Sequence, residues 1–192
     1  MPADFSDVLD FWFAPPQSRE RGLNRKAWFR KDERFDEQIR ERFLPTFEAA
    51  SAGKLDAWSS TPYAALALIV VLDQFPRNLY RGEARAFSSD ARALSAARRF
   101  VERRFDRVLR PLERVFAYLP FEHREDLAVQ RRALALFERL ERHPECADFL
   151  EYARRHHEII ARFGRFPHRN EVLGRTSSAE EAAFLQQPGS RF

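Results

Sequence analysis

The stretch RFGRFPHRN, residues 162–170, holds the densest set of side chains that could bind a ligand. Three arginines, a histidine and an asparagine stand among two phenylalanines, and all of these polar groups can donate hydrogen bonds. Guanidinium and imidazole donors at fixed positions are what proteins use to bind a carboxylate or a phosphate. The candidate ligand-binding residues in this stretch are Arg165, His168, Arg169 and Asn170.

Further polar residues fall on helix faces that should turn towards the core. On helical wheels, His123 and Gln130 lie inside one apolar stripe, with Asp126 at its edge. His156 lies at the centre of the stripe of the next helix, and Asp73 ends a helix that is apolar on every side. Burying such groups unpaired costs about 1–3 kcal/mol each, so we expect them to meet one another.

Together these residues suggest a proton-transfer site beside an anion-binding site. Either buried histidine would transfer the proton, oriented by one of the two aspartates. The ligand-binding set would also include Arg77 and Asn78 of the segment LDQFPRN, and Gln130. Because donors outnumber acids in this set, we expect spare donor capacity that favours a small anionic ligand.

Two other interpretations fit the same residues. A buried polar network can fix the packing of helices without any ligand, and lone histidines in cores usually serve this purpose. An arginine-lined groove on a helical solenoid could instead bind an acidic peptide or a C-terminal carboxylate. The sequence therefore leaves open whether the protein is an enzyme, whether it uses a cofactor and what its oligomeric state is.

Metal and thiol chemistry are disfavoured. Glu122-His123, Asp126 and His156 could supply metal ligands, but no HExxH pattern occurs and the neighbouring arginines would repel a cation. Nothing places His156 beside Cys146, so a nucleophilic cysteine is not indicated. The chain also lacks a glycine-rich phosphate loop and a dinucleotide-binding fingerprint.

The composition favours a globular cytoplasmic protein. Hydrophobic residues make up 44% and aromatic residues 14% of the 192 residues, which argues against disorder. The longest apolar run, residues 64–72, is half the roughly 18 residues of a membrane span, and the acidic N-terminus does not resemble a signal peptide. The single cysteine excludes an internal disulfide. The net charge is +4, but basic and acidic residues alternate, so the basic stripe typical of nucleic-acid binding is absent.

Helical spacing recurs along the chain and strand alternation is absent. This pattern predicts one all-α domain over residues 1–192, with seven or eight helices in antiparallel pairs. Serine, threonine and aspartate caps, prolines and glycines set the expected boundaries. Ser6 should cap the first helix, Pro45 should bend or interrupt the second, and a capping box should run from Ser177 to Glu180. The expected helices span 6–13, 32 onwards, 62–75, 88 or 89 to 104, 111–120, 122–142, 145–163 and 177–187.

Three segments resemble the bacterial domain-of-unknown-function 924 family: LDQFPRNLYRG (72–82), LPFEHREDLAVQ (119–130) and HHEIIARFGRFPHRNEVLGRTSSAEEAAFL (156–185). The N-terminal segments VLDFWF and KAWFRKDERFDEQI are also similar to it, so the resemblance covers nearly the whole chain. It implies a tetratricopeptide-repeat-like (TPR-like) helical fold. The lone histidine of the family corresponds to His156. No activity comes with the resemblance.

Overall fold

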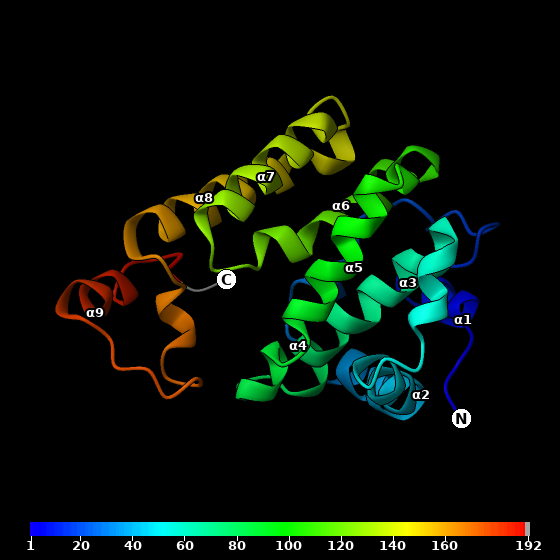
Figure 1. Cartoon of the computed structure of the whole chain (residues 1–192), viewed down its shortest axis with the longest axis horizontal. Helices are drawn as coiled ribbons and strands as arrows, with labels where there is room; N and C mark the ends of the chain where they lie inside the picture. The colour runs from blue at the N-terminus through cyan, green and yellow to red at the C-terminus, as the bar shows by residue number, and fades with distance from the viewer. Residues whose placement is uncertain (191–192) are drawn as a thin grey trace.

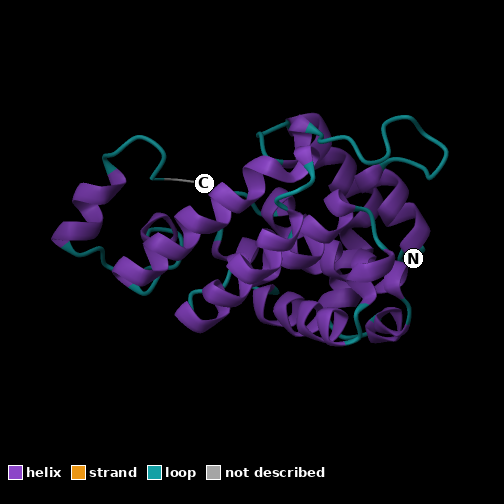
Figure 2. Ribbon diagram, turned by 90° about the horizontal axis from the view of Figure 1, so that it is seen from above, coloured by secondary structure: helices purple, strands orange, loops and turns teal. Residues whose placement is uncertain are grey.

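The computed structural model describes residues 1–190, and every regular element in this range is helical (Figure 2). The all-α fold class is therefore confirmed. The α-helices are α1 (Phe5–Phe13), α2 (Glu33–Ser51), α3 (Pro62–Asp73), α4 (Phe75–Leu79), α5 (Asp90–Glu102), α6 (Pro111–Glu122), α7 (Leu127–Phe137), α8 (Ala147–Phe163) and α9 (Ala179–Leu185). The 3-10 helices are η1 (Lys26–Trp28), η2 (Asp56–Ser60), η3 (Ala84–Phe87), η4 (Phe105–Val108), η5 (Glu138–Leu140), η6 (Pro144–Cys146) and η7 (Pro167–Arg169).

The apolar helix α3 lies inside the molecule, as its sequence predicts. Every residue from Ala64 to Asp73 is buried, because this segment has no polar face to offer to water. Helices α1, α2, α5 and α6 pack around it (Figure 1). Aromatic rings fill the space beside α3, with Trp12 in contact with Phe75 and Phe116 at centroid distances of 5.7 and 5.5 Å. No helix in residues 1–190 is both long enough and apolar enough to cross a membrane.

The end of α3 brings two polar segments together. Proline at position 76 has no N–H and cannot bond to the carbonyl of Leu72, so the helix breaks after Asp73 and resumes as α4. The hydroxyl of Ser89 donates to the Leu72 carbonyl instead, at 2.6 Å. Since Ser89 directly precedes α5, this bond places Asp90, the first residue of α5, beside the break.

Two prolines that were expected to interrupt or end a helix instead lie within one. Helix α2 continues through Pro45, and α6 continues past Pro120 to Glu122. Helix α7 then begins only at Leu127, because the exposed Asp126 caps it by accepting a backbone N–H at 3.0 Å. The expected helix over residues 122–142 is therefore shorter, and a corner of four residues precedes it.

Two helix caps also differ from their expected positions. Asp4 caps α1 and accepts a bond from the amide of Ser6, which was the expected cap. Ser178 and Glu181 form the capping box of α9, one residue later than predicted, because the hydroxyl of Ser177 is bonded to the preceding segment.

The C-terminal helices α7 and α8 share the main core with α6, and α9 does not. Helices α7 and α8 pack side by side, and α9 lies beyond the end of α8, away from α1 and α2 (Figure 1). Helix α8 ends at Phe163 and is capped by Gly164, whose φ of 69° lies in the left-handed region that glycine adopts without strain. Pro167 then starts η7, so residues 164–170 fold back towards the α6–α7 corner instead of extending the helix.

Candidate functional site

A buried aspartate and a histidine form the centre of the polar cluster. Oδ1 of Asp73 accepts a hydrogen bond from Nδ1 of His123 at 2.8 Å, and Oδ2 accepts from Gln74 at 2.6 Å. The Asp73 side chain is fully buried, whereas 14% of the His123 side chain is exposed. Because Nδ1 carries the donated proton, Nε2 of the neutral imidazole carries the lone pair. No residue in the described range bonds to this Nε2.

Electrostatics favour a charged aspartate and a neutral histidine. Burial opposes ionisation of Asp73, but His123, Arg77 and the hydrogen bonds from His123 and Gln74 hold its pKa below the ordinary value. Burial, followed by the charge of Arg77, lowers the pKa of His123. At neutral pH the imidazole is therefore free of the extra proton and can accept one, with a carboxylate to stabilise the resulting cation.

A second acid and histidine lie next to this pair. Nδ1 of His156 is 3.1 Å from Oε1 of Glu122 and 2.9 Å from the carbonyl of Tyr152. The His156 ring lies 6.5 Å from that of His123 and meets Phe166 edge-on at 5.4 Å. The three polar groups that the sequence places in separate helix stripes, Asp73, His123 and His156, are thus brought together.

The second pair carries no net charge. Burial, and then the charge of Asp73, raises the pKa of Glu122 to about 8, so this carboxyl keeps its proton at neutral pH. Burial lowers the pKa of His156 to about 3, so this imidazole stays neutral. Oε2 of Glu122 is buried and has no hydrogen-bond partner among the described residues.

Two arginines reach the cluster from different elements. Arg77 of α4 contacts both oxygens of Asp90, at 2.9 and 3.2 Å, and donates to the carbonyl of Asp73 at 2.5 Å. Arg169 of η7 donates to the carbonyl of His123 at 3.1 Å and lies 3.5 Å from Asp90. Asp90 therefore bridges the two guanidinium groups.

The guanidinium of Arg169 is held between two aromatic rings. It lies 4.6 Å from the centroid of Phe87 and 4.5 Å from that of Phe166, and its side chain is 8% exposed. Its Nε is buried without a hydrogen-bond partner in residues 1–190. Burial, and then the charge of Arg77, lowers its pKa to about 10, so it remains a cation at neutral pH. Arg169 is thus a positioned cation with unused donor capacity.

An acid in the α6–α7 corner holds the segment that carries Arg169. The carboxylate of Glu125 accepts from the amide of Phe166 at 2.8 Å and from Arg175 at 2.7 and 2.9 Å. Arg175 also donates to the carbonyl of Phe166 at 3.1 Å. The half-buried His168 packs its ring against Phe166 at 5.6 Å, so it lies at the edge of the cluster.

Two predicted binding residues point away from the cluster because other acids pair with them. Arg165 contacts both oxygens of Glu181 in α9, at 2.6 and 2.8 Å. The hydrogen bond from Arg165 is the main reason that the pKa of Glu181 falls to about 2. Asn78 donates to Asp36 of α2 at 2.7 Å. Both side chains therefore join helices of the scaffold.

Three further predicted residues complete local backbone structure. Asp126 caps α7 and does not orient a histidine, which Asp73 does instead. The side-chain amide of Gln130 donates to the backbone carbonyls of Glu122 and Arg124, at 2.5 and 2.8 Å. Asn170 donates to a serine hydroxyl at 3.0 Å and accepts from an arginine at 2.9 Å.

Several residues of the cluster escape sequence reasoning. Ser89-Asp90 reads as an ordinary helix start, and Phe87 as a loop aromatic, so neither stands out. The one usable signal is Glu122, an acid within the apolar run LPFEH. Because Asp90 pairs with both arginines, the expected excess of donors is smaller than the sequence predicts, and it rests mainly on Arg169.

The described residues of the cluster include neither a metal-binding group nor a thiol. Among the described residues, no three or more histidine, cysteine, aspartate and glutamate side chains are arranged to hold a metal ion. Cys146 is buried at the start of α8, and burial raises the pKa of its thiol to about 12. It is therefore protonated and unreactive at neutral pH.

Comparison with known proteins adds a family but no activity. The model of a bacterial family of proteins of unknown function, DUF924, matches residues 8–189. A solved structure of a protein of unknown function, ATU0120 from Agrobacterium tumefaciens, is 38% identical, with a TM-score of 0.84 over 95% of this chain and 96% of that one. No curated protein matches the chain. The family match includes every residue of the polar cluster.

Proposed function

The chain belongs to the bacterial DUF924 family of unknown function, and we propose that it is an enzyme that binds a small anionic metabolite and uses His123 as a general base. The observation that carries this proposal is the Asp73–His123 hydrogen bond of 2.8 Å, with the lone pair of Nε2 bonded to no described residue. A carboxylate that fixes the tautomer and orientation of an imidazole is a recurrent feature of proton-transfer sites.

The second part of the proposal is the anion-binding group. Arg169 is positioned by stacking on two rings and by the bond from its Nη1 to the carbonyl of His123, and its Nη2 bonds to no described residue. Charge-assisted hydrogen bonds to a guanidinium are roughly twice as strong as neutral ones. A ligand held by Arg169 would therefore be presented to His123.

The exposure of the cluster indicates how a ligand would enter. The side chains of Arg77, Asp90 and His123 are 20%, 16% and 14% exposed, whereas Asp73 and Glu122 are sealed inside. The entrance therefore lies on the side formed by α4, the start of α5 and the α6–α7 corner.

Charge balance narrows the class of ligand. Arg77 and Arg169 are neutralised by Asp73 and Asp90, while Glu122 and both histidines are neutral at pH 7. A ligand with one negative charge uses the spare donors of Arg169 without much repulsion, whereas a phosphate dianion would meet two nearby carboxylates. We therefore propose a monocarboxylate rather than a phosphate.

The binding part is tested with a panel of small carboxylates and short peptides with acidic C-termini. A ligand that stabilises the protein in thermal-shift measurements should bind Arg169→Gln at least tenfold more weakly, because a charged hydrogen bond is worth about 1.5–3 kcal/mol. Arg165→Gln is the matched control, since Arg165 pairs with Glu181 away from the cluster. Equal losses in both variants would refute the site, and a response to peptides alone would indicate an interaction module.

The catalytic part is tested on the ligand that this panel identifies. His123→Gln should keep binding within a few-fold but lose turnover by roughly 100- to 10,000-fold, the usual contribution of a general base. The pH profile of the wild type should fall on the acid side, where His123 becomes protonated. Unchanged turnover in His123→Gln would show that the cluster only binds.

A further inference from the structure

A second group of arginines lines a hollow built from elements other than those that carry the Asp73–His123 pair. The hollow has a volume of about 240 Å³ and lies between the end of α5, η4, α7 and η5. Four arginines and two acids provide its polar lining: Arg104, Arg107, Arg132, Arg139, Glu102 and Asp106.

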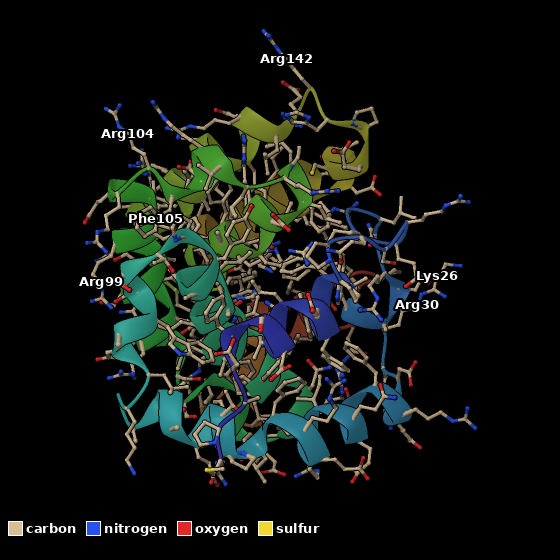
Figure 3. The ribbon with its side chains drawn as sticks, turned by 90° about the vertical axis from the view of Figure 1, so that its right-hand side faces the viewer. Lys26, Arg30, Arg99, Arg104, Phe105 and Arg142 are labelled. Atoms are coloured by element: carbon tan, nitrogen blue, oxygen red, sulfur yellow. The ribbon has the colours of Figure 1, made fainter. Side chains whose placement is uncertain are left out.

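The turn after α5 is built so that two of these arginines border the hollow. Arg104 has a φ of 59°, in the left-handed region, which reverses the chain directly after the helix. Phe105 packs edge-on against Phe100 at 5.7 Å, and the buried Asp106 accepts a bond from the hydroxyl of Tyr118 at 2.8 Å. These contacts fix the turn, and Figure 3 shows the Arg104 side chain extending outward beside it.

The other two arginines come from a different part of the chain. Arg132 lies on α7 and Arg139 on η5, where its Nη1 is 3.9 Å from Asp106. The side chains of Arg104, Arg107 and Arg132 make no ion pair or hydrogen bond with any residue in the described range. Four arginines against two acids leave a surplus of two positive charges around the hollow.

We infer that this hollow is a second binding site, for a small molecule that carries one or two phosphoryl groups. The surplus of two positive charges matches a phosphate dianion, and guanidinium groups from three elements can donate to several oxygens at once. The volume is below the roughly 300–1,000 Å³ of pockets that hold drug-sized ligands, so the bound part is compact. This site differs in charge from the Asp73–His123 cluster, and it does not depend on the function proposed for that cluster.

Inorganic pyrophosphate is the probe, titrated into the wild type by calorimetry at low ionic strength and again in high salt. We expect saturable binding that weakens in salt, because these arginines are exposed. The double variant Arg132→Ala/Arg139→Ala should bind at least tenfold more weakly. Arg142→Gln is the control, since Arg142 is exposed but does not line the hollow, and its affinity should stay within about twofold.

Arg104→Gly distinguishes a lost site from a lost fold. Glycine adopts the left-handed backbone without strain, so this variant should keep or gain thermal stability while it loses one guanidinium. We expect its affinity for pyrophosphate to drop several-fold. No saturable binding to the wild type, or unchanged affinity in the double variant, would overturn the inference. Tighter binding of a single-stranded oligonucleotide through the same arginines would replace it with a nucleic-acid surface.

Discussion

The interior around α3 and the segment from Gly164 to Leu185 are held in place by different forces. Around α3, apolar helices and aromatic rings such as Trp12, Phe75 and Phe116 are buried in one large cluster. The later segment buries far fewer apolar side chains and depends on charged contacts such as Glu125–Arg175 and Arg165–Glu181. The apolar packing around α3 should therefore be insensitive to salt, whereas the segment that delivers Arg169 should be weakened by it.

The largest effect should come from the aromatic interior. Phe116→Ala removes a fully buried ring and should lower the free energy of unfolding by about 3–5 kcal/mol, as measured by chemical denaturation. Phe166→Ala removes an equally buried ring from the small C-terminal cluster and should cost less, because that cluster can collapse locally. Equal costs would show that the two regions are not distinct in stability.

Glu122 should give the protein a specific pH dependence. The folded state keeps its proton up to a pKa of about 8, whereas the unfolded chain loses it near 4.5. Between these values the unfolded state binds fewer protons, so the stability of the wild type falls as pH rises. Glu122→Gln cannot ionise and should be more stable than the wild type well above pH 8, by up to about 5 kcal/mol, with little difference near pH 4.5.

Denaturation across this pH range compares the variant with Glu158→Gln, a change at an exposed position on α8. That control should follow the wild type at every pH. If Glu122→Gln does so too, the carboxyl is not protonated in the folded state.

A smaller and more local effect is expected at Glu125. Glu125→Gln weakens the contact with Arg175 and should cost about 1–3 kcal/mol, mainly in the segment after Gly164. Hydrogen exchange should accelerate at the amide of Phe166, which donates a hydrogen bond to Glu125, and stay slow in α3. Glu180→Gln, which breaks an exposed pair with Arg162, is the matched control and should cost less than about 1 kcal/mol.

The smallest effect should come from the cap of α7. Asp126→Ala should cost about 1 kcal/mol, the usual value of an N-cap, because its carboxylate accepts the amide of Val129. Ligand binding at the cluster should not change. A large loss of binding with an intact helix, measured by thermal shift and circular dichroism, would show that Asp126 belongs to the binding site.

Periodicity alone predicts the helices and the meeting of Asp73, His123 and His156. Asp73 ends the buried helix α3 and His156 lies on the buried face of α8, but His123 lies in the corner after α6 and not on the helix stripe that the sequence predicts for it. The cost of burying an unpaired polar group still favours the meeting of the three. The same reasoning misplaces the boundary between α6 and α7, because Asp126 as a cap and Pro120 inside a helix oppose the simpler pattern. The TPR-like arrangement of the helix pairs stays a prediction.

The partners of the arginines could not be predicted, because they depend on contacts between distant segments. Arg165 and Arg169 are four residues apart in one motif, yet one pairs with an acid in α9 and the other reaches Asp90 in α5. Asp90 looks like any acid at a helix start, and only the folded chain shows that Ser89 anchors it to the Leu72 carbonyl. Sequence patterns report which faces are buried, not which buried groups touch.

The proline break after α3 has a consequence for the order in which the site is assembled during synthesis. Asp73, Arg77, Asp90 and His123 all belong to the first two-thirds of the chain, and the Leu72–Ser89 bond joins the segments that carry the first three. The nascent chain can therefore complete the acid–histidine pair together with the aromatic interior while Arg169 is still untranslated. Arg169 then joins a cluster whose acid–histidine pair is already formed.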